Sequence, residues 1–499
     1  MWLTDTQRAD LAPAEQALAG LPLPTRVVSN GEYLPPPQTA EQRAVEARLS
    51  AHADTLGARL RMDRRRFMQT SCGLAAAFLA MNEVFGAFFQ VDAAEAADPQ
   101  AGRARAAALA GEFVFDSQTH HVGANYRWPG PAHARAFAQG RNPQRTPWNP
   151  ALGTVPPTLE HLRLEGYIKE VFLDSDTTVA VLSGFTADIK EREALSSDEI
   201  ASSRNLINRL AGGQRVLAHG LFWPGYPGYL EEMDRLAREL RIDSWKGYPM
   251  GDLTADSQYP WRLDDERVTY PALDRAVKHG IRNVCLHKGL FPPHLKHWQY
   301  ASVDDVARAA RDWPSLNFII YHSALRAPLD VTAAAETFRT TGRIPWVTDL
   351  AEIPGKAGTS NVYAELGTTF ASTVVTFPEL AAAILGQLVK GMGADHVLWG
   401  TDSIWYGSPQ WQIEAFRRFE IPEAMQRQHG FAPLGDATGP TKRRIFGLNG
   451  AALYGLTPSA SRGVVPPDFR DRLGRIKAEY ETEGGTRSND YYGWVRRSA

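Results

Sequence analysis

Several apolar runs of this chain end in polar side chains of the types that bind metal ions. The run 113–120 begins Phe-Val-Phe and ends with Gln118 and His120, which point to the same side because side chains alternate along a strand. Three later apolar runs close in the same way, with His287, His322 and Asp402. Such nitrogen and oxygen donors can hold a divalent ion, which activates a bound water or polarises a carbonyl.

The same residue types can also move protons. An aspartate beside a metal-bound water can take its proton and later return it to a leaving group. A histidine that does not bind the metal can hold and polarise the substrate. A single histidine at the end of a strand is more often an ordinary buried residue. Three of them together with a strand-end aspartate favour a functional site.

Eight β-rich runs alternate with amphipathic or Ala/Leu/Arg-rich runs from Gly111 onward. The predicted strands are Phe113–His120, Val179–Phe185, Val216–Phe222, Trp245–Met250, Asn283–Leu290, Phe318–Ser323, Val362–Gly367 and Val397–Asp402. This pattern predicts a (β/α)₈ TIM barrel, with an open doubly wound sheet as the alternative. Catalytic groups of such barrels lie at the carboxyl ends of the strands, where the polar residues fall.

Composition excludes several classes of function. Among 499 residues, 54 Lys and Arg balance 56 Asp and Glu, which leaves no basic field for nucleic acid. Only two cysteines occur, so a disulfide framework and a thiolate zinc cage are both excluded. Hydrophobic residues make up 43% of the chain, enough for the large core of a globular enzyme.

We divide the chain into an N-terminal extension (1–110), a barrel (111–456) and a C-terminal tail (457–499). Paired arginines at 64–66, an apolar stretch and small residues up to 97 are typical of a twin-arginine export signal. The alternative, a folded helical extension of a cytoplasmic protein, is favoured because about sixty residues precede the arginines. No window has the ~20 uninterrupted apolar residues of a membrane span. Residues 127–154 are predicted to form a long loop over the active face.

The pattern Asp116-x-Gln118-x-His120, the strand-end His287 and His322, and Gly400-Thr401-Asp402 resemble the amidohydrolase superfamily, in its amidohydrolase-related (family 2) branch. The closing run 444–455, RIFGLNGAALYG, is similar to the last helix of that branch. The resemblance extends from about residue 113 to 455. It implies a (β/α)₈ barrel with one divalent metal, commonly Zn²⁺ and sometimes Mn²⁺.

The resemblance also implies roles. His120, His287 and Asp402 match metal ligands, Asp402 also handles protons, and His322 matches the histidine that contacts substrate or assists protonation. Gln118 departs from the family, which usually has His there, and a neutral amide oxygen would favour a harder ion such as Mn²⁺. Lys246 lies on the strand that carries a carbamylated lysine in binuclear members, but stacking on Trp245 or Tyr248 is the simpler interpretation.

The predicted substrate contacts lie around this set. Trp405 and Tyr406 follow Asp402 closely and are expected to form the pocket wall for an aromatic or apolar small molecule. Lys288 is either a contact for an anionic substrate or a solvated loop charge, and Glu365 either a substrate contact or a salt-bridge partner. His121 faces away from His120 and is expected behind the site. We also expect a homo-oligomer.

Two reactions compete. In the first, which the long loops and aromatic rim favour, water activated by Asp402 hydrolyses an amide, ester or lactone. In the second, an aromatic acid loses its carboxyl group non-oxidatively, and Asp402 or His322 protonates the ring carbon. A barrel that binds without a metal is the third possibility, because Gln118 replaces the usual histidine.

Overall fold

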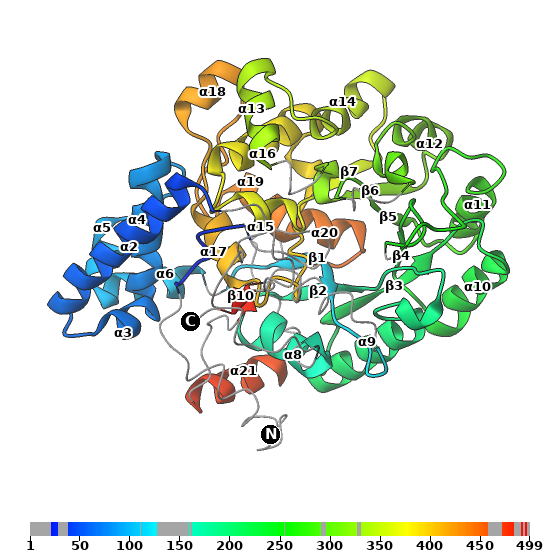
Figure 1. Ribbon diagram of the computed structural model, residues 1–499. Coiled ribbons are helices and arrows are strands. Elements are labelled where there is room, and N and C mark those ends of the chain that lie inside the picture. The colour runs from blue at the N-terminus through cyan, green and yellow to red at the C-terminus, as the bar shows by residue number, and fades with distance from the viewer. Residues whose placement is uncertain are drawn as a thin grey trace, which may run out of the picture.

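The computed structural model describes residues 21–27, 38–109, 111–126, 159, 162–253, 255–290, 296–326, 331–457, 472–483, 491–492 and 495–496. Its centre is a sheet of eight parallel strands that neighbour one another in chain order (Figure 1). The strands are β1 (Phe115–His120), β2 (Val179–Ser183), β3 (Val216–Phe222), β4 (Ser244–Gly247), β5 (Asn283–His287), β6 (Asn317–Tyr321), β7 (Val362–Glu365) and β8 (Val397–Leu398). All eight lie within the runs predicted from the sequence or extend them by one residue.

The sheet closes on itself beyond the end of β8. The amide of Ser117 donates to the carbonyl of Trp399 at 3.0 Å, and the amide of Asp402 donates to the carbonyl of Gln118 at 3.0 Å. A parallel bridge between Thr119 and Ser403 continues this pairing. The fold is therefore a (β/α)₈ barrel, in which closure brings the end of β1 against the segment that carries Asp402.

Helices surround the barrel. Its strands are largely apolar along their length, so both faces of the sheet must be covered, and the strand residues are buried. They are α8 (Leu164–Ile168), α9 (Ser197–Ala211), α10 (Tyr229–Arg235), α11 (Tyr270–Lys278), α12 (Val306–Asp312), α13 (Val331–Thr341), α14 (Val347–Ala357), α15 (Thr369–Thr373), α16 (Pro378–Met392), α17 (Gln410–Arg418), α18 (Glu423–His429), α19 (Pro440–Arg443) and α20 (Asn449–Leu453). The closing run 444–455 begins as a π-helical turn and continues into α20.

The N-terminal residues form a helical layer on one side of the barrel, shown in blue beside α17 in Figure 1. Its helices are α2 (Ala40–Arg59), α3 (Arg64–Met68), α4 (Ser71–Phe85), α5 (Ala93–Ala97) and α6 (Pro99–Leu109). The twin-arginine-like segment thus folds as helices, and the apolar α4 is largely buried. Phe89 packs on Phe419, and Arg418 of α17 forms a buried ion pair with Glu95 at 2.8 Å. The predicted helical extension is confirmed; its export stays a prediction.

The C-terminal helix α21 (Arg472–Thr482) packs against the barrel, where the Tyr480 hydroxyl donates to Asp174 Oδ1 at 2.7 Å. The short strands β9 (Tyr491–Tyr492) and β10 (Val495–Arg496) pair antiparallel. No helix in the described part of the chain is long and apolar enough to cross a membrane. The predicted loop 127–154 lies outside the described residues.

Candidate active site

Three side chains from the two closing strands of the barrel meet at the carboxyl end. His120 Nε2 lies 3.1 Å from Asp402 Oδ1, and the amide nitrogen of Gln118 lies 3.0 Å from the same oxygen and 3.3 Å from His120 Nε2. The other His120 nitrogen, Nδ1, lies 3.0 Å from the carbonyl of Ser183. A carbonyl only accepts, so the Nδ1 hydrogen points there and Nε2 is the nitrogen that faces the carboxylate.

The other two predicted histidines form a second pair. His287 Nε2 lies 2.6 Å from the carbonyl of Leu290, His322 Nδ1 lies 2.9 Å from that of Gly367, and the remaining nitrogens lie 3.1 Å apart. Burial lowers the pKa of His322 to about 4 and that of His287 well below its ordinary value. Two neutral rings have two hydrogens, and the carbonyls take both. The facing nitrogens therefore both carry lone pairs.

The facing lone pairs of His287 and His322 repel each other unless a cation lies between them, and a divalent ion is one cation that can bind there. Burial alone would raise the pKa of Asp402, but the hydrogen bond with His120, the charges of His120 and His322 and the bond from Thr368 together lower it. Asp402 thus contributes a carboxylate to the set. Across the described part of the chain, no three His, Cys, Asp or Glu side chains converge closely enough to surround a metal. The candidate ligand atoms instead form two facing pairs, His120 with Asp402 and His287 with His322.

Gln118 differs from the sequence expectation in its orientation. Its amide nitrogen, rather than its oxygen, faces His120 and Asp402, and its buried Oε1 has no partner among the described residues. That oxygen lies against Gly367, where a Cβ would approach it to 2.5 Å. A half-turn of the amide would exchange the two atoms, so Gln118 can either donate to the carboxylate or present an oxygen to a cation.

Aromatic rings cover both pairs. Trp405 stacks on His120 with 5.5 Å between ring centroids, and its role in a pocket wall stays a prediction. Tyr248 stacks on His287 at 4.9 Å. Tyr406, the other predicted wall residue, is fully buried, and its hydroxyl donates to Thr368 instead. The rings flank the histidines on flat faces, which suits a planar substrate.

Lys246 is a fully buried cation near the same centre. Its Nζ lies 3.5 Å from the centroid of the Tyr321 ring and 4.9 Å from that of Tyr248. Besides burial, its charge contributes to lowering the pKa values of His287 and His322. The simpler interpretation of this lysine, stacking on Tyr248, is confirmed, and Tyr321 of β6 adds a second ring.

Glu365 lies at the end of β7 and holds backbone in place. Its carboxyl accepts the amide of His322 at 3.1 Å and that of Gly367 at 2.7 Å. Burial raises its pKa to about 8, although these amides and the charge of Lys246 oppose the rise. Since both carboxyl oxygens serve backbone amides, Glu365 supports the turn at His322, where φ is +61°.

Two predicted substrate contacts lie away from the facing pairs. The Lys288 ammonium is held by both oxygens of Asp305, at 2.8 and 2.9 Å, and by the carbonyl of Tyr300 at 2.9 Å. Its charge is therefore matched inside the protein. His121 contacts the Ser203 hydroxyl at 3.0 Å and packs on Tyr167.

Sequence reasoning did not find Thr368 or His219. Thr368 donates a short hydrogen bond to Asp402 Oδ2. His219 lies in the middle of β3, fully buried, with Nε2 3.3 Å from the Tyr321 hydroxyl. A polar residue inside an apolar strand is a signal that could have found His219. Thr368 follows β7 in a turn and carries no such signal.

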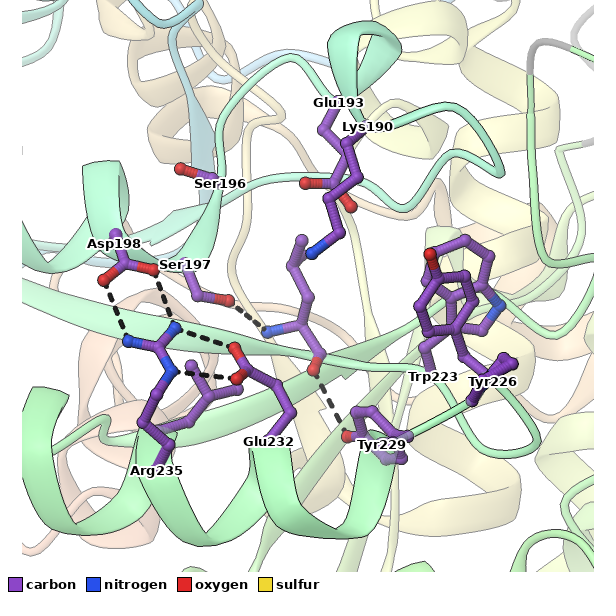
Figure 2. Close-up of a pocket in the computed structure, with 14 residues that line it drawn as sticks. Lys190, Glu193, Ser196, Ser197, Asp198, Trp223, Tyr226, Tyr229, Glu232 and Arg235 are labelled. Atoms are coloured by element: carbon purple, nitrogen blue, oxygen red, sulfur yellow. Dashed lines mark hydrogen bonds and ion pairs between the residues drawn. The ribbon is translucent and has the colours of Figure 1, made fainter.

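A separate cavity of about 290 Å³ lies between α9 and the segment that joins β3 to α10 (Figure 2). Arg235 on one side is held by Asp198 and Glu232, with contacts of 2.7 to 3.0 Å. On the other side, the rings of Trp223 and Tyr226 stack at 4.3 Å. The residues that line this cavity include none of the predicted site residues.

Residues 218–456 match the family model described as amidohydrolase. None of the curated proteins matches the chain. An uncharacterized TIM-barrel protein from Bordetella bronchiseptica is 16% identical, with 68% of this chain and 99% of that chain covered and a TM-score of 0.44. The 5-carboxyvanillate decarboxylase of Novosphingobium aromaticivorans, with bound manganese and a nitrobenzoic acid, is 15% identical (70% and 98% covered, TM-score 0.38). A 2,6-dihydroxybenzoate decarboxylase from Rhizobium is 15% identical (69% and 98% covered, TM-score 0.36).

Proposed function

We propose that this chain, whose residues 218–456 match the amidohydrolase family model, is a member of the amidohydrolase-related (family 2) branch that removes the carboxyl group of a small aromatic acid as CO₂ in a metal-dependent reaction. The observation that carries this proposal is the buried Lys246, whose Nζ lies over the rings of Tyr321 and Tyr248, next to His322 and His287. A buried cation attracts an anion more strongly than a solvated one does. With a divalent ion bound nearby, the positive charge of the site would favour a carboxylate substrate.

The aromatic rings support a flat substrate. Trp405 and Tyr248 stack on His120 and His287 respectively, one ring over each facing pair. A planar acid between them would exchange water for aromatic contacts, which are worth about 0.5–1.5 kcal/mol per ring pair beyond the buried area. The same rings exclude water and strengthen the attraction between Lys246 and a carboxylate.

Decarboxylation needs one proton at the ring carbon. The bond between the ring and the carboxyl carbon breaks, its electron pair stays on the ring carbon, and a proton from the protein takes the place of CO₂. His322 and Asp402 can hold this proton, and solvent restores it after each turnover. A bound carboxylate would raise the pKa of His322 from about 4, because an opposite charge favours the protonated ring.

His120, His287 and Asp402 are the residues that would hold the divalent ion, with Gln118 beside them. When bound, such an ion supplies a Lewis acid that orients substrate oxygens and stabilises negative charge. Ser183 and Leu290 orient the two histidines through their carbonyls, which fixes the nitrogen that each ring presents.

Hydrolysis of an amide, ester or lactone is the second candidate. The lowered pKa of Asp402 favours it, because an ionised carboxylate can take a proton from water. A neutral carbonyl substrate, however, makes no use of the buried charge of Lys246. We therefore rank decarboxylation above hydrolysis, the reverse of the order that the sequence favours.

A substrate panel distinguishes the two reactions. The protein, loaded with Mn²⁺ or Zn²⁺, is incubated with hydroxybenzoates and, separately, with anilides, aryl esters and lactones. We expect CO₂ and the decarboxylated arene in equal amounts from at least one hydroxybenzoate. Hydrolysis of the neutral substrates without any CO₂ from the acids would contradict the proposal. The Asp402→Asn variant serves as the blank for contaminating activity.

A further inference from the structure

Gly367 to Thr369, which follow one residue after the end of β7, form a strained turn beside the site. The amide of Thr369 donates to the carbonyl of Gly367 at 2.5 Å, and Thr368 between them has φ 58° and ψ −47°. This γ-turn with positive φ is rare, and such strain costs about 1–3 kcal/mol. A β-branched residue is an outlier there, whereas glycine would adopt the conformation easily. A threonine at this position indicates a use for its side chain.

The Thr368 hydroxyl has a specific partner. It donates a short hydrogen bond to Asp402 Oδ2, and the Tyr406 hydroxyl donates to Thr368 Oγ1 at 3.1 Å. All three residues are buried. Because Gln118 donates to the other carboxylate oxygen, Oδ1, the plane of the Asp402 carboxylate is fixed from both sides.

The same turn also contacts His322. The Gly367 carbonyl accepts from His322 Nδ1 at 2.9 Å, and the Thr369 hydroxyl donates to the His322 carbonyl. Gly367 further lies against the amide of Gln118, too close for a side chain. One turn thus reaches the histidine of the second facing pair and the carboxylate of the first.

We propose that Thr368, supported by Tyr406, is a positioning residue that orients the Asp402 carboxylate for the metal ion and for proton transfer. The inference rests on the proposed function, because it assigns Asp402 those roles. Loss of the hydroxyl would leave Asp402 Oδ2 without this donor and allow the carboxylate to rotate. Changing a partner that orients a metal ligand typically lowers metal affinity about 10–100-fold.

Four variants of the full-length protein test this. Metal-free protein is titrated with Mn²⁺ against a chromophoric chelator, and the rate of CO₂ release is measured in parallel. We expect Thr368→Val to bind Mn²⁺ about 10–100-fold more weakly, Thr368→Ser to stay within about threefold of the wild type, and Tyr406→Phe to lie between them. Thr376→Val is the matched control, since Thr376 is a buried threonine whose hydroxyl bonds only the Ser372 carbonyl, at 2.8 Å. It should bind Mn²⁺ like the wild type.

Equal Mn²⁺ affinity of Thr368→Val and wild type would overturn the positioning role while leaving the proposed function intact. If Thr368→Ser and Thr368→Val bind Mn²⁺ equally weakly, the positioning role is also overturned, because a structural effect of the substitution would then explain both losses. If Thr368→Val does not fold, the Tyr406→Phe variant provides the test. A Mn²⁺ affinity of Tyr406→Phe equal to that of the wild type would then overturn the inference. A wild-type protein that binds no Mn²⁺ or Zn²⁺ would instead overturn the proposed function, and the role of the turn with it.

Discussion

Asp402→Asn is expected to lower turnover by about 10³-fold or more while leaving the fold intact. The amide has nearly the shape of the carboxylate and can still accept from Thr368, so packing is preserved. It cannot take up a proton, and it replaces one charged ligand atom with an NH₂ group. The initial rate of CO₂ release and the metal content of the purified variant measure the effect.

A matched control separates catalysis from stability. Asp174 is also a buried aspartate, paired with Lys169 at 2.7 Å, but it precedes β2 and so lies at the opposite end of the barrel from the site. Asp174→Asn should lower the free energy of unfolding and leave turnover per folded molecule unchanged. Retained turnover in Asp402→Asn would move the proton-transfer role to another residue, with His322 the next candidate.

Lys246→Met is expected to lower kcat/KM for an aromatic acid about 100-fold, mainly through KM. Methionine has a similar length and fills the same buried space. Truncating one partner of a buried charge pair costs about 2–5 kcal/mol of binding, and about 2.7 kcal/mol corresponds to 100-fold. Steady-state kinetics with the best acid of the panel measure the change, and a neutral ester or lactone provides the comparison.

Lys288→Met is the contrasting variant. Lys288 is equally buried, and its ammonium forms an ion pair with Asp305. We expect its loss to destabilise the protein by about 3–5 kcal/mol, because Asp305 is left as an uncompensated buried charge. Substrate affinity of the folded protein should change little. The reverse pattern, a raised KM in Lys288→Met and normal kinetics in Lys246→Met, would restore Lys288 as the anion contact that the sequence suggested.

The strands could be predicted from the sequence because each is a short apolar run between breakers or polar residues. After Arg235, α10 continues as a π-helical turn, which apolar periodicity does not distinguish from an α-helix. In α14, Pro354 lies inside the helix and obscures the pattern. Local sequence therefore identifies the elements better than their exact form.

The site was predictable to the extent that it depends on strand ends. His120 and Asp402 are far apart in sequence, but each lies at the end of a predicted strand. Closure of the barrel brings His120 Nε2 to 3.1 Å from Asp402 Oδ1. The partner of Lys288 could not be predicted, because Asp305 lies 17 residues further along, after a loop. The role of Thr368 depends on a turn with positive φ, which nothing in a Gly-Thr-Thr run signals.

The central claim is that the two facing pairs, His120 with Asp402 and His287 with His322, are the place where one divalent ion binds. An anomalous difference map from crystals of the Mn²⁺-loaded protein tests this most directly. We predict one strong peak in contact with side chains of these two pairs. The absence of a peak there, or a stoichiometric peak elsewhere in the molecule, would contradict the account.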